Sequence, residues 1–203
     1  MTRTDRERDQ DDVDLANDPR WRRLLDHPWS CGACGETHQG LIDLACGKPA
    51  QWPGSEDKAP NGALDLSGNF LSGDFCVLEG QHFFVRAVLE LPIRGGGRQR
   101  FGFGVWTTLS RGSFERYIAT FDSGEQDELG PWFGWFSNRL EGYPDTLNLK
   151  CQVHPVSGRQ RSRVLLEPTD HPLAIEQQNG ITFDRLLELY AISGHDIKTS
   201  LSD

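Results

Sequence analysis

The stretch DFCVLEGQHFFVRAVLEL, residues 74–91, decides the fold of this chain. Its second half alternates apolar residues with others, which is typical of a strand that buries one face. The apolar face consists of Phe83, Val85, Ala87, Leu89 and Leu91. Glu79 and Gly80 suggest a two-residue turn, so we expect a β-hairpin in which Cys76 lies opposite Phe83 on the apolar face. A free cysteine at such a position is often a core residue.

Outward from this hairpin, local patterns predict the other elements. Residues 101–109 alternate large side chains with Gly102 and Gly104, which indicates a strand with a neighbour packed closely on the glycines. Ser110 is a suitable N-cap for an amphipathic helix. The remaining expected elements are a short helix from Pro19 to Leu25, strands at 147–153 and 163–167, and a helix capped by Thr182. This irregular order favours the α+β class, with a mostly antiparallel sheet and two main helices.

Composition limits the function of the chain. Its 203 residues carry 21 Lys and Arg against 30 Asp and Glu, a net charge of −9, which disfavours nucleic acid as a partner. Apolar stretches are interrupted by charges before they reach the roughly 18 residues of a membrane span. The start of the chain has no apolar core of a secretory signal, so we expect a bacterial-type cytoplasmic protein.

The domain organisation follows from the same composition. Residues 1–20 are densely charged and offer little to bury, so we expect a disordered tail. Residues 47–62 are rich in Gly, Pro and charge and are typical of a loop. We therefore divide the chain into the tail (1–20), a short helix with a cysteine-bearing element and a loop (21–62), and an α+β domain (63–203).

The element Cys31-Gly-Ala-Cys34-Gly is half of a zinc ribbon. Two thiolates spaced in this way can bind one ion, and in a reducing compartment the pair indicates a metal site or a redox pair before a structural disulfide. A second Cys-x-x-Cys is missing, so the other ligands would come from His38, Cys46, Cys76, Cys151 or a distant histidine. Spacing alone favours Cys46. We expect an N-terminal zinc-knuckle-like element with a structural zinc ion, and a thiol redox pair is the alternative.

Several motifs resemble the bacterial DUF2199 family, a family of unknown function. They include Cys31-Gly-Ala-Cys-Gly-Glu-Thr-His38, Asp74-Phe-Cys-Val-Leu, Gly104-Val-Trp-Thr-Thr-Leu-Ser110, Phe133-Gly-Trp-Phe-Ser-Asn138, Tyr143-Pro-Asp-Thr-Leu and Glu167-Pro-Thr-Asp-His-Pro. The resemblance implies that Cys31, Cys34, His38 and Cys76 occupy patterned positions, whereas Cys46 does not. It therefore moves the expected fourth ligand from Cys46 to Cys76. It implies no reaction.

Other candidate binding residues are aromatic or polar. Trp106, Trp132 and Trp135 either pack in the core or line a groove for a peptide or a ring-bearing ligand. The further candidates are Asn138, Tyr143, Asp145, Asp170 and His171. Common nucleophile, phosphate-loop and dinucleotide motifs are missing. We therefore expect a non-enzymatic zinc-binding module that binds a protein partner, of the adaptor or toxin-neutralising type. The alternative is a metal-dependent or hydrolase-like enzyme that uses His171 with Glu167 or Asp145.

Overall fold

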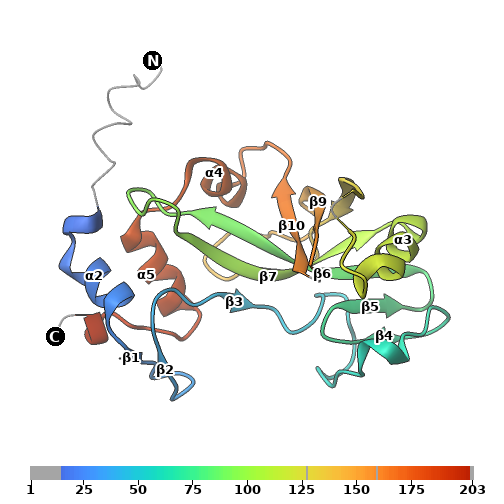
Figure 1. The fold of residues 1–203 in the computed structure, drawn as a ribbon, viewed down its shortest axis with the longest axis horizontal. Coiled ribbons are helices and arrows are strands. Elements are labelled where there is room, and N and C mark those ends of the chain that lie inside the picture. The colour runs from blue at the N-terminus through green and yellow to red at the C-terminus, as the bar shows by residue number, and fades with distance from the viewer. Residues whose placement is uncertain (1–14, 127, 159, 202–203) are drawn as a thin grey trace. The chain divides into compact units, whose positions relative to one another are not determined.

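The computed structural model describes residues 15–126, 128–158 and 160–201 (Figure 1). These residues form two compact units that are interleaved along the chain. Unit 1 contains residues 15–43, 91–101 and 175–201, and unit 2 contains residues 44–90, 102–126, 128–158 and 160–174. The division expected from the sequence was sequential, whereas each unit here combines separate segments. The expected tail extends beyond the described residues, since only its residues 15–20 are described.

Within the described residues, an eight-stranded sheet has the order β3-β7-β6-β10-β9-β8, with β5 paired to β6 and β4 paired to β5. Its strands are β3 (Leu44–Ala45), β4 (Phe70–Leu71), β5 (Phe75–Leu78), β6 (His82–Pro92), β7 (Arg100–Leu109), β8 (Trp132–Trp135), β9 (Lys150–Val156) and β10 (Gln160–Leu166). The α+β class is confirmed, but the sheet is mixed: β10 runs parallel to β6, and β3 runs parallel to β7. The long connection between β6 and β10 allows this parallel return.

The hairpin of β5 and β6 differs from expectation by one residue. Leu78 pairs with His82, so the loop has three residues, with Glu79 and Gly80 at φ 55° and 64°. A shift of one residue moves every side chain of a strand to the other face. Cys76 therefore pairs with Phe84 and not with Phe83. It packs in a cluster with Leu71, Phe84 and Trp106, which is separate from the cluster of Phe83.

Helix α3 (Arg111–Phe121) follows β7 as the sequence predicts. The hydroxyl of Ser110 accepts a hydrogen bond from the Ser113 amide, which caps the helix. Phe114 and Tyr117 of α3 are buried against Phe75 and other side chains of the hairpin. The Phe75 and Phe114 rings meet edge to face, with centroids 5.9 Å apart. This aromatic cluster forms part of the core of unit 2.

Unit 1 gathers helices and a small sheet. Its elements are η1 (Leu15–Asn17), α2 (Pro19–Asp26), β1 (Trp29–Ser30), β2 (Thr37–His38), α5 (Phe183–Ile192) and η3 (Thr199–Leu201). Arg20 of α2 forms an ion pair with Asp184 of α5 at 2.8 Å, and Trp21 packs edge to face on Phe183. The Tyr190 hydroxyl donates to the carbonyl of Ile42 at 2.8 Å. These contacts hold α2, α5 and the segment after β2 together.

Helix α4 (Pro172–Asn179) was not expected, because Asp170-His171-Pro172 suggests a turn. The turn is also the start of this helix: Nδ1 of His171 accepts a hydrogen bond from the Leu173 amide. The described residues thus contain four α-helices: α2, α3 and α5, which correspond to the short helix and the two main helices expected, and α4. None of the described helices has the length and apolar character needed to cross a membrane.

Candidate metal centre

The candidate metal centre begins with the turn that joins β1 and β2. The two strands pair Trp29 with His38. In the turn, the Gly35 amide donates to the carbonyl of Cys31, and the Cys31 amide donates to the carbonyl of Glu36, both at 2.9 Å. Gly35 has a φ of 72°, which favours glycine at this position. The turn therefore places Cys31, Cys34 and His38 at one end of a small hairpin.

Two groups of possible ligand atoms meet at this turn. The Sγ atoms of Cys31 and Cys34 and a ring nitrogen of His195 all lie within 4.8 Å of one another. Cys34 also belongs to a second group of the same kind with Glu36 and His38. The shortest contacts join Cys31 Sγ to His195 Nδ1 and Cys34 Sγ to His38 Nε2, each at 3.1 Å. Cys31, Cys34 and His195 thus lie close enough together to bind a metal ion.

His195 was not among the candidates named from the sequence. It follows the end of α5, where Gly194 adopts a φ of 82°, and its amide donates to the carbonyl of Tyr190 at 2.7 Å. The separation of 164 residues from Cys31 leaves no local pattern to find it. The only signal in the sequence is the glycine that ends the helix directly before it. The expectation of a distant histidine covers this ligand without naming it.

The environment of Cys31 favours a thiolate. The residue is 2% exposed. Burial alone raises the pKa of its thiol, but the amides of Cys34 and Ala33 and the ring of His195 outweigh this effect and lower the pKa to about 6. Backbone N–H groups that point at a sulfur stabilise its negative charge. Cys31 is thus set up as an anionic ligand or a nucleophile, whereas Cys34 is exposed.

The other cysteines have a different environment. Cys76, the ligand expected from the family resemblance, is fully buried in unit 2, and burial raises its pKa to about 12. Among the described residues, neither of the metal-type groups contains it. Burial also raises the pKa of Cys46 to about 11 and that of Cys151 to about 12. Burial therefore favours the neutral form of these three thiols.

Two of the expected binding residues have structural roles in unit 2. Trp106 is fully buried, and its indole donates to the carbonyl of Cys46 at 3.2 Å. The side chain of Asn138 accepts from the Trp106 amide at 2.6 Å and donates to the carbonyl of Lys48 at 2.8 Å. Asn138 therefore joins a strand to the segment after β3 within unit 2.

Strand β8 presents aromatic side chains to solvent. Phe133 is 44% exposed and Trp135 is 40% exposed, and their rings meet edge to face at 5.0 Å. Two adjoining hollows of about 520 and 560 Å³ share Trp135, His82 and Thr108 in their walls. Trp132 lines the larger one. Trp106 is thus a core residue, whereas Trp132 and Trp135 border an open groove.

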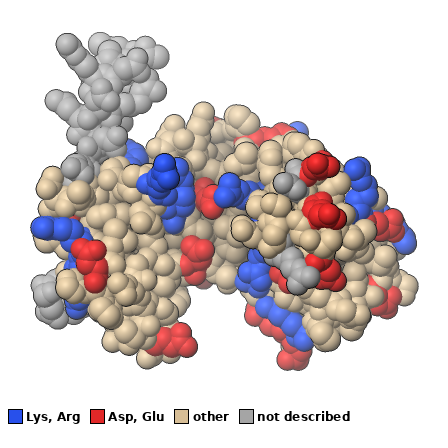
Figure 2. Space-filling model, in the orientation of Figure 1, with Lys and Arg blue, Asp and Glu red and all other residues tan. Residues whose placement is uncertain are grey.

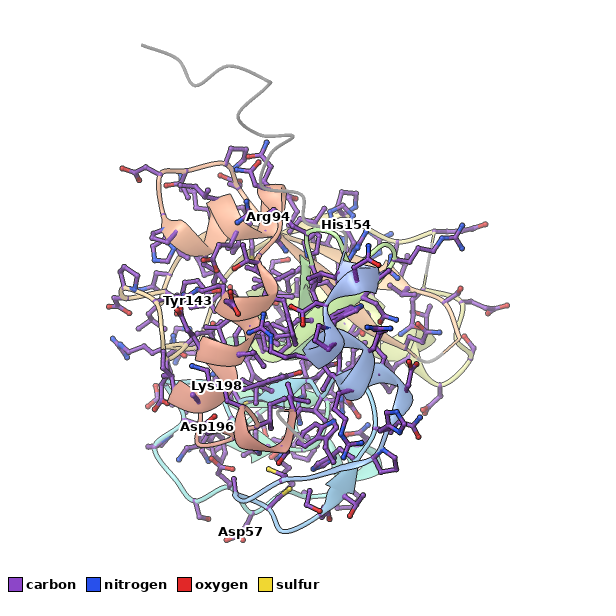
Figure 3. All side chains as sticks on the ribbon, turned by 90° about the vertical axis from the view of Figure 1, so that its left-hand side faces the viewer. Asp57, Arg94, Tyr143, His154, Asp196 and Lys198 are labelled. Atoms are coloured by element: carbon purple, nitrogen blue, oxygen red, sulfur yellow. The ribbon has the colours of Figure 1, made fainter. Side chains whose placement is uncertain are left out.

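The remaining candidates do not form a common site. Tyr143, labelled in Figure 3, packs edge to face on Phe103. Asp145 pairs with Arg139 at 3.2 Å on the surface, and Asp170 is exposed. Nε2 of His171 is buried without a hydrogen-bond partner. In the described part of the chain, no hydrogen bond or ion pair joins His171 to Glu167 or Asp145.

These features define an α+β protein with a Cys and His cluster that is compatible with zinc binding. The model of the DUF2199 family, described as "Uncharacterized protein conserved in bacteria", matches residues 30–181 of the 203-residue chain. The chain belongs to this family, as the motifs predict. Comparisons with curated proteins and with solved structures give no match. Cys31, Cys34 and His38 lie within the matched residues, and His195 lies outside them.

Proposed function

We propose that this protein holds a structural zinc ion at the turn between β1 and β2 and acts as a protein-interaction module. The observation that carries the zinc proposal is the clustering of the Cys31 and Cys34 sulfurs with an imidazole nitrogen inside 4.8 Å. Thiolate and imidazole ligands together favour zinc over magnesium or calcium, which prefer oxygen. A largely buried thiolate also favours a structural ion over a readily exchanged one.

Metal content of the full chain, purified without chelator, tests this proposal. We expect about one zinc per chain by elemental mass spectrometry. Cys31→Ala should abolish zinc binding, because it removes a thiolate from the cluster. Cys76→Ala is the matched control, since Cys76 packs among apolar side chains of unit 2 and should leave the zinc content unchanged. A wild-type chain that takes up no zinc would overturn the proposal, and loss of zinc in Cys76→Ala would restore Cys76 as a ligand.

Mild oxidation distinguishes the zinc site from the alternative, a thiol redox pair of Cys31 and Cys34. If Cys31 and Cys34 hold zinc, mild oxidant should form no disulfide between them until chelator is added. A disulfide formed at the same rate with and without zinc would favour the redox function. Cys46, Cys76 and Cys151 do not complicate the measurement, because their raised pKa values keep them as slow-reacting thiols at pH 8.

The interaction role is supported by the exposed ring pair of Phe133 and Trp135 beside the two hollows. Exposed aromatic side chains are enriched in protein interfaces. Affinity capture with the wild type and with Trp135→Ala tests the role of the Trp135 ring, which borders both hollows. Ile192→Ala, on an exposed helix position of unit 1, is the control. A partner that saturates the wild type and the control but is lost with Trp135→Ala would support this role, and equal capture by all three would count against it.

A further inference from the structure

The segment that follows α5 is folded back on the small hairpin of unit 1. Ile197 and Leu201 are buried, at 1% and 4% exposure. The Ser200 hydroxyl donates to the carbonyl of Ser30 in β1 at 3.3 Å. The carboxylate of Asp196, labelled in Figure 3 with Lys198, accepts from the Lys198 amide at 3.1 Å and shapes the turn. We call this segment, residues 194–201, the C-terminal clasp.

The clasp presents one imidazole to the thiol pair, and the hairpin presents another. His195 Nδ1 lies 3.1 Å from Cys31 Sγ, and His38 Nε2 lies 3.1 Å from Cys34 Sγ. In a tetrahedral zinc site with two sulfur and two nitrogen ligands, neighbouring ligand atoms are roughly 3.3–3.8 Å apart. Both contacts are close to this separation, so each thiolate has one imidazole beside it. His38 and the pair of Cys31 and His195 belong to separate groups that share Cys34, so one ion bound by all four residues requires their ligand atoms to move closer together.

The orientation of His38 is fixed by its neighbour in the hairpin. Its ring lies against Trp29, with centroids 4.8 Å apart and an interplanar angle of 39°. Trp29 is buried, and its indole donates to the carbonyl of Gly40 at 3.2 Å. A ligand ring held by packing loses little freedom when it binds a metal. The hairpin therefore holds the His38 ring with its Nε2 beside Cys34 Sγ.

We propose that His195 and His38 complete the site as a closed Cys₂His₂ centre, in which the zinc ion fastens the C-terminal clasp to the β1–β2 hairpin. This rests on the zinc site proposed above and goes beyond it by assigning the ligand set and the role of the ion. Two thiolates neutralise the two positive charges of zinc, so a neutral centre forms beside the buried residues of unit 1. Four protein ligands leave no open position for a substrate, and the centre is structural.

The rival explanation of the short contacts is a metal-free pair of a Cys31 thiolate and a His195 imidazolium. It explains the contact of Cys31 with His195 but not the convergence of Cys34 with the same ring, nor the matching contact of Cys34 with His38. The metal-free pair also predicts that added zinc does not change the reactivity of His195 toward reagents that modify imidazoles. The two explanations therefore differ in the number of nitrogen ligands and in the protection of one histidine.

X-ray absorption at the zinc edge of the wild-type chain tests the ligand set directly. We expect two sulfur ligands at about 2.3 Å and two imidazole nitrogens at about 2.0 Å. Loss of a residue that only supports a metal ligand typically lowers metal affinity by about tenfold to a hundredfold. His195→Asn removes a ligand itself, so we expect it to lower zinc affinity by at least this much. His27→Asn, the same substitution at an exposed position of unit 1, should change neither the spectrum nor the affinity.

A second measurement keeps the test valid if His195→Asn does not fold. Diethyl pyrocarbonate modifies free imidazoles, and mass spectrometry locates the modified residue in the wild type. We expect zinc to protect His195 and His38, with His27 modified equally in both states. Two sulfurs with fewer than two nitrogens, or equal modification of His195 with and without zinc, would overturn this inference and leave zinc binding intact. Absence of any zinc binding would instead overturn the proposed function.

Discussion

At the scale of single residues, Asn138 is a buried polar side chain that joins two segments of unit 2. Both ends of its amide are used inside the protein, by the Trp106 amide and by the carbonyl of Lys48. Asn138→Ala leaves two backbone groups unpaired, and we expect a loss of about 2 kcal/mol in the free energy of unfolding. Gln178→Ala, at an exposed helix position, should stay within about 0.5 kcal/mol of the wild type. Denaturant titration of both variants measures the difference, and equal stabilities would show that water replaces the amide.

The candidate centre was only partly predictable from residue patterns. Cys31 and Cys34 are found from their spacing, because a two-residue gap and a following glycine place both thiols on one turn. His38 is found because it lies four residues further along a short hairpin. His195 has no such relation to them, since its place depends on where α5 ends and on the burial of Ile197 and Leu201 beyond it. Cys76 shows the opposite case, in which the motif marks a position that the structure fills with a core residue.

At the scale of elements, β8 depends on a glycine in its middle. A Cβ on Gly134 would lie 2.5 Å from the carbonyl oxygen of Thr108 in β7. Because that neighbour is backbone, β8 would have to shift, and we expect Gly134→Ala to cost about 1–3 kcal/mol of stability. Gly112 in α3 has nothing within 4 Å of such a Cβ, so Gly112→Ala should instead gain about 0.5 kcal/mol. We expect the unfolding temperature to fall for Gly134→Ala and to rise for Gly112→Ala. An unchanged unfolding temperature for Gly134→Ala would refute the expected shift of β8.

The long strands and capped helices were predictable, whereas register and short strands were not. Alternation over residues 83–91 reports a buried face whatever the partner strand is. The register with the partner strand depends on whether the loop has two or three residues. Glu79 adopts a left-handed conformation, which the residue type Glu does not predict. β3 and β4 have two residues each, too few to show a period. The parallel pairing of β10 with β6 joins residues about 75 positions apart in sequence and has no local pattern.

At the scale of the whole molecule, the two units should respond differently to loss of metal. Acidic and basic side chains are interspersed over the face shown in Figure 2. The proposed zinc ligands all belong to unit 1. In hydrogen exchange of the full chain, a chelator should remove protection from residues 29–38 and 195–201 and leave β9 and β10 protected.

Cys31→Ala serves as the control for that experiment, since chelator should have no further effect on a chain that holds no metal. Uniform loss of protection in both units on chelation would contradict a centre that stabilises unit 1 alone. Unchanged protection of residues 195–201 would show that Ile197 and Leu201 anchor the clasp without zinc.

The separation of 164 residues between Cys31 and His195 also bears on how the protein is made. The ribosome synthesises the thiols of the hairpin early and the imidazole of His195 only after all of unit 2. If the centre binds zinc as proposed, the nascent chain lacks one ligand during that interval, and its thiol pair should hold the ion more weakly than the completed centre. A polypeptide cut short before residue 195 would keep its cysteines exposed to oxidation and to quality-control proteases. Tight metal retention would thus distinguish finished copies from unfinished ones.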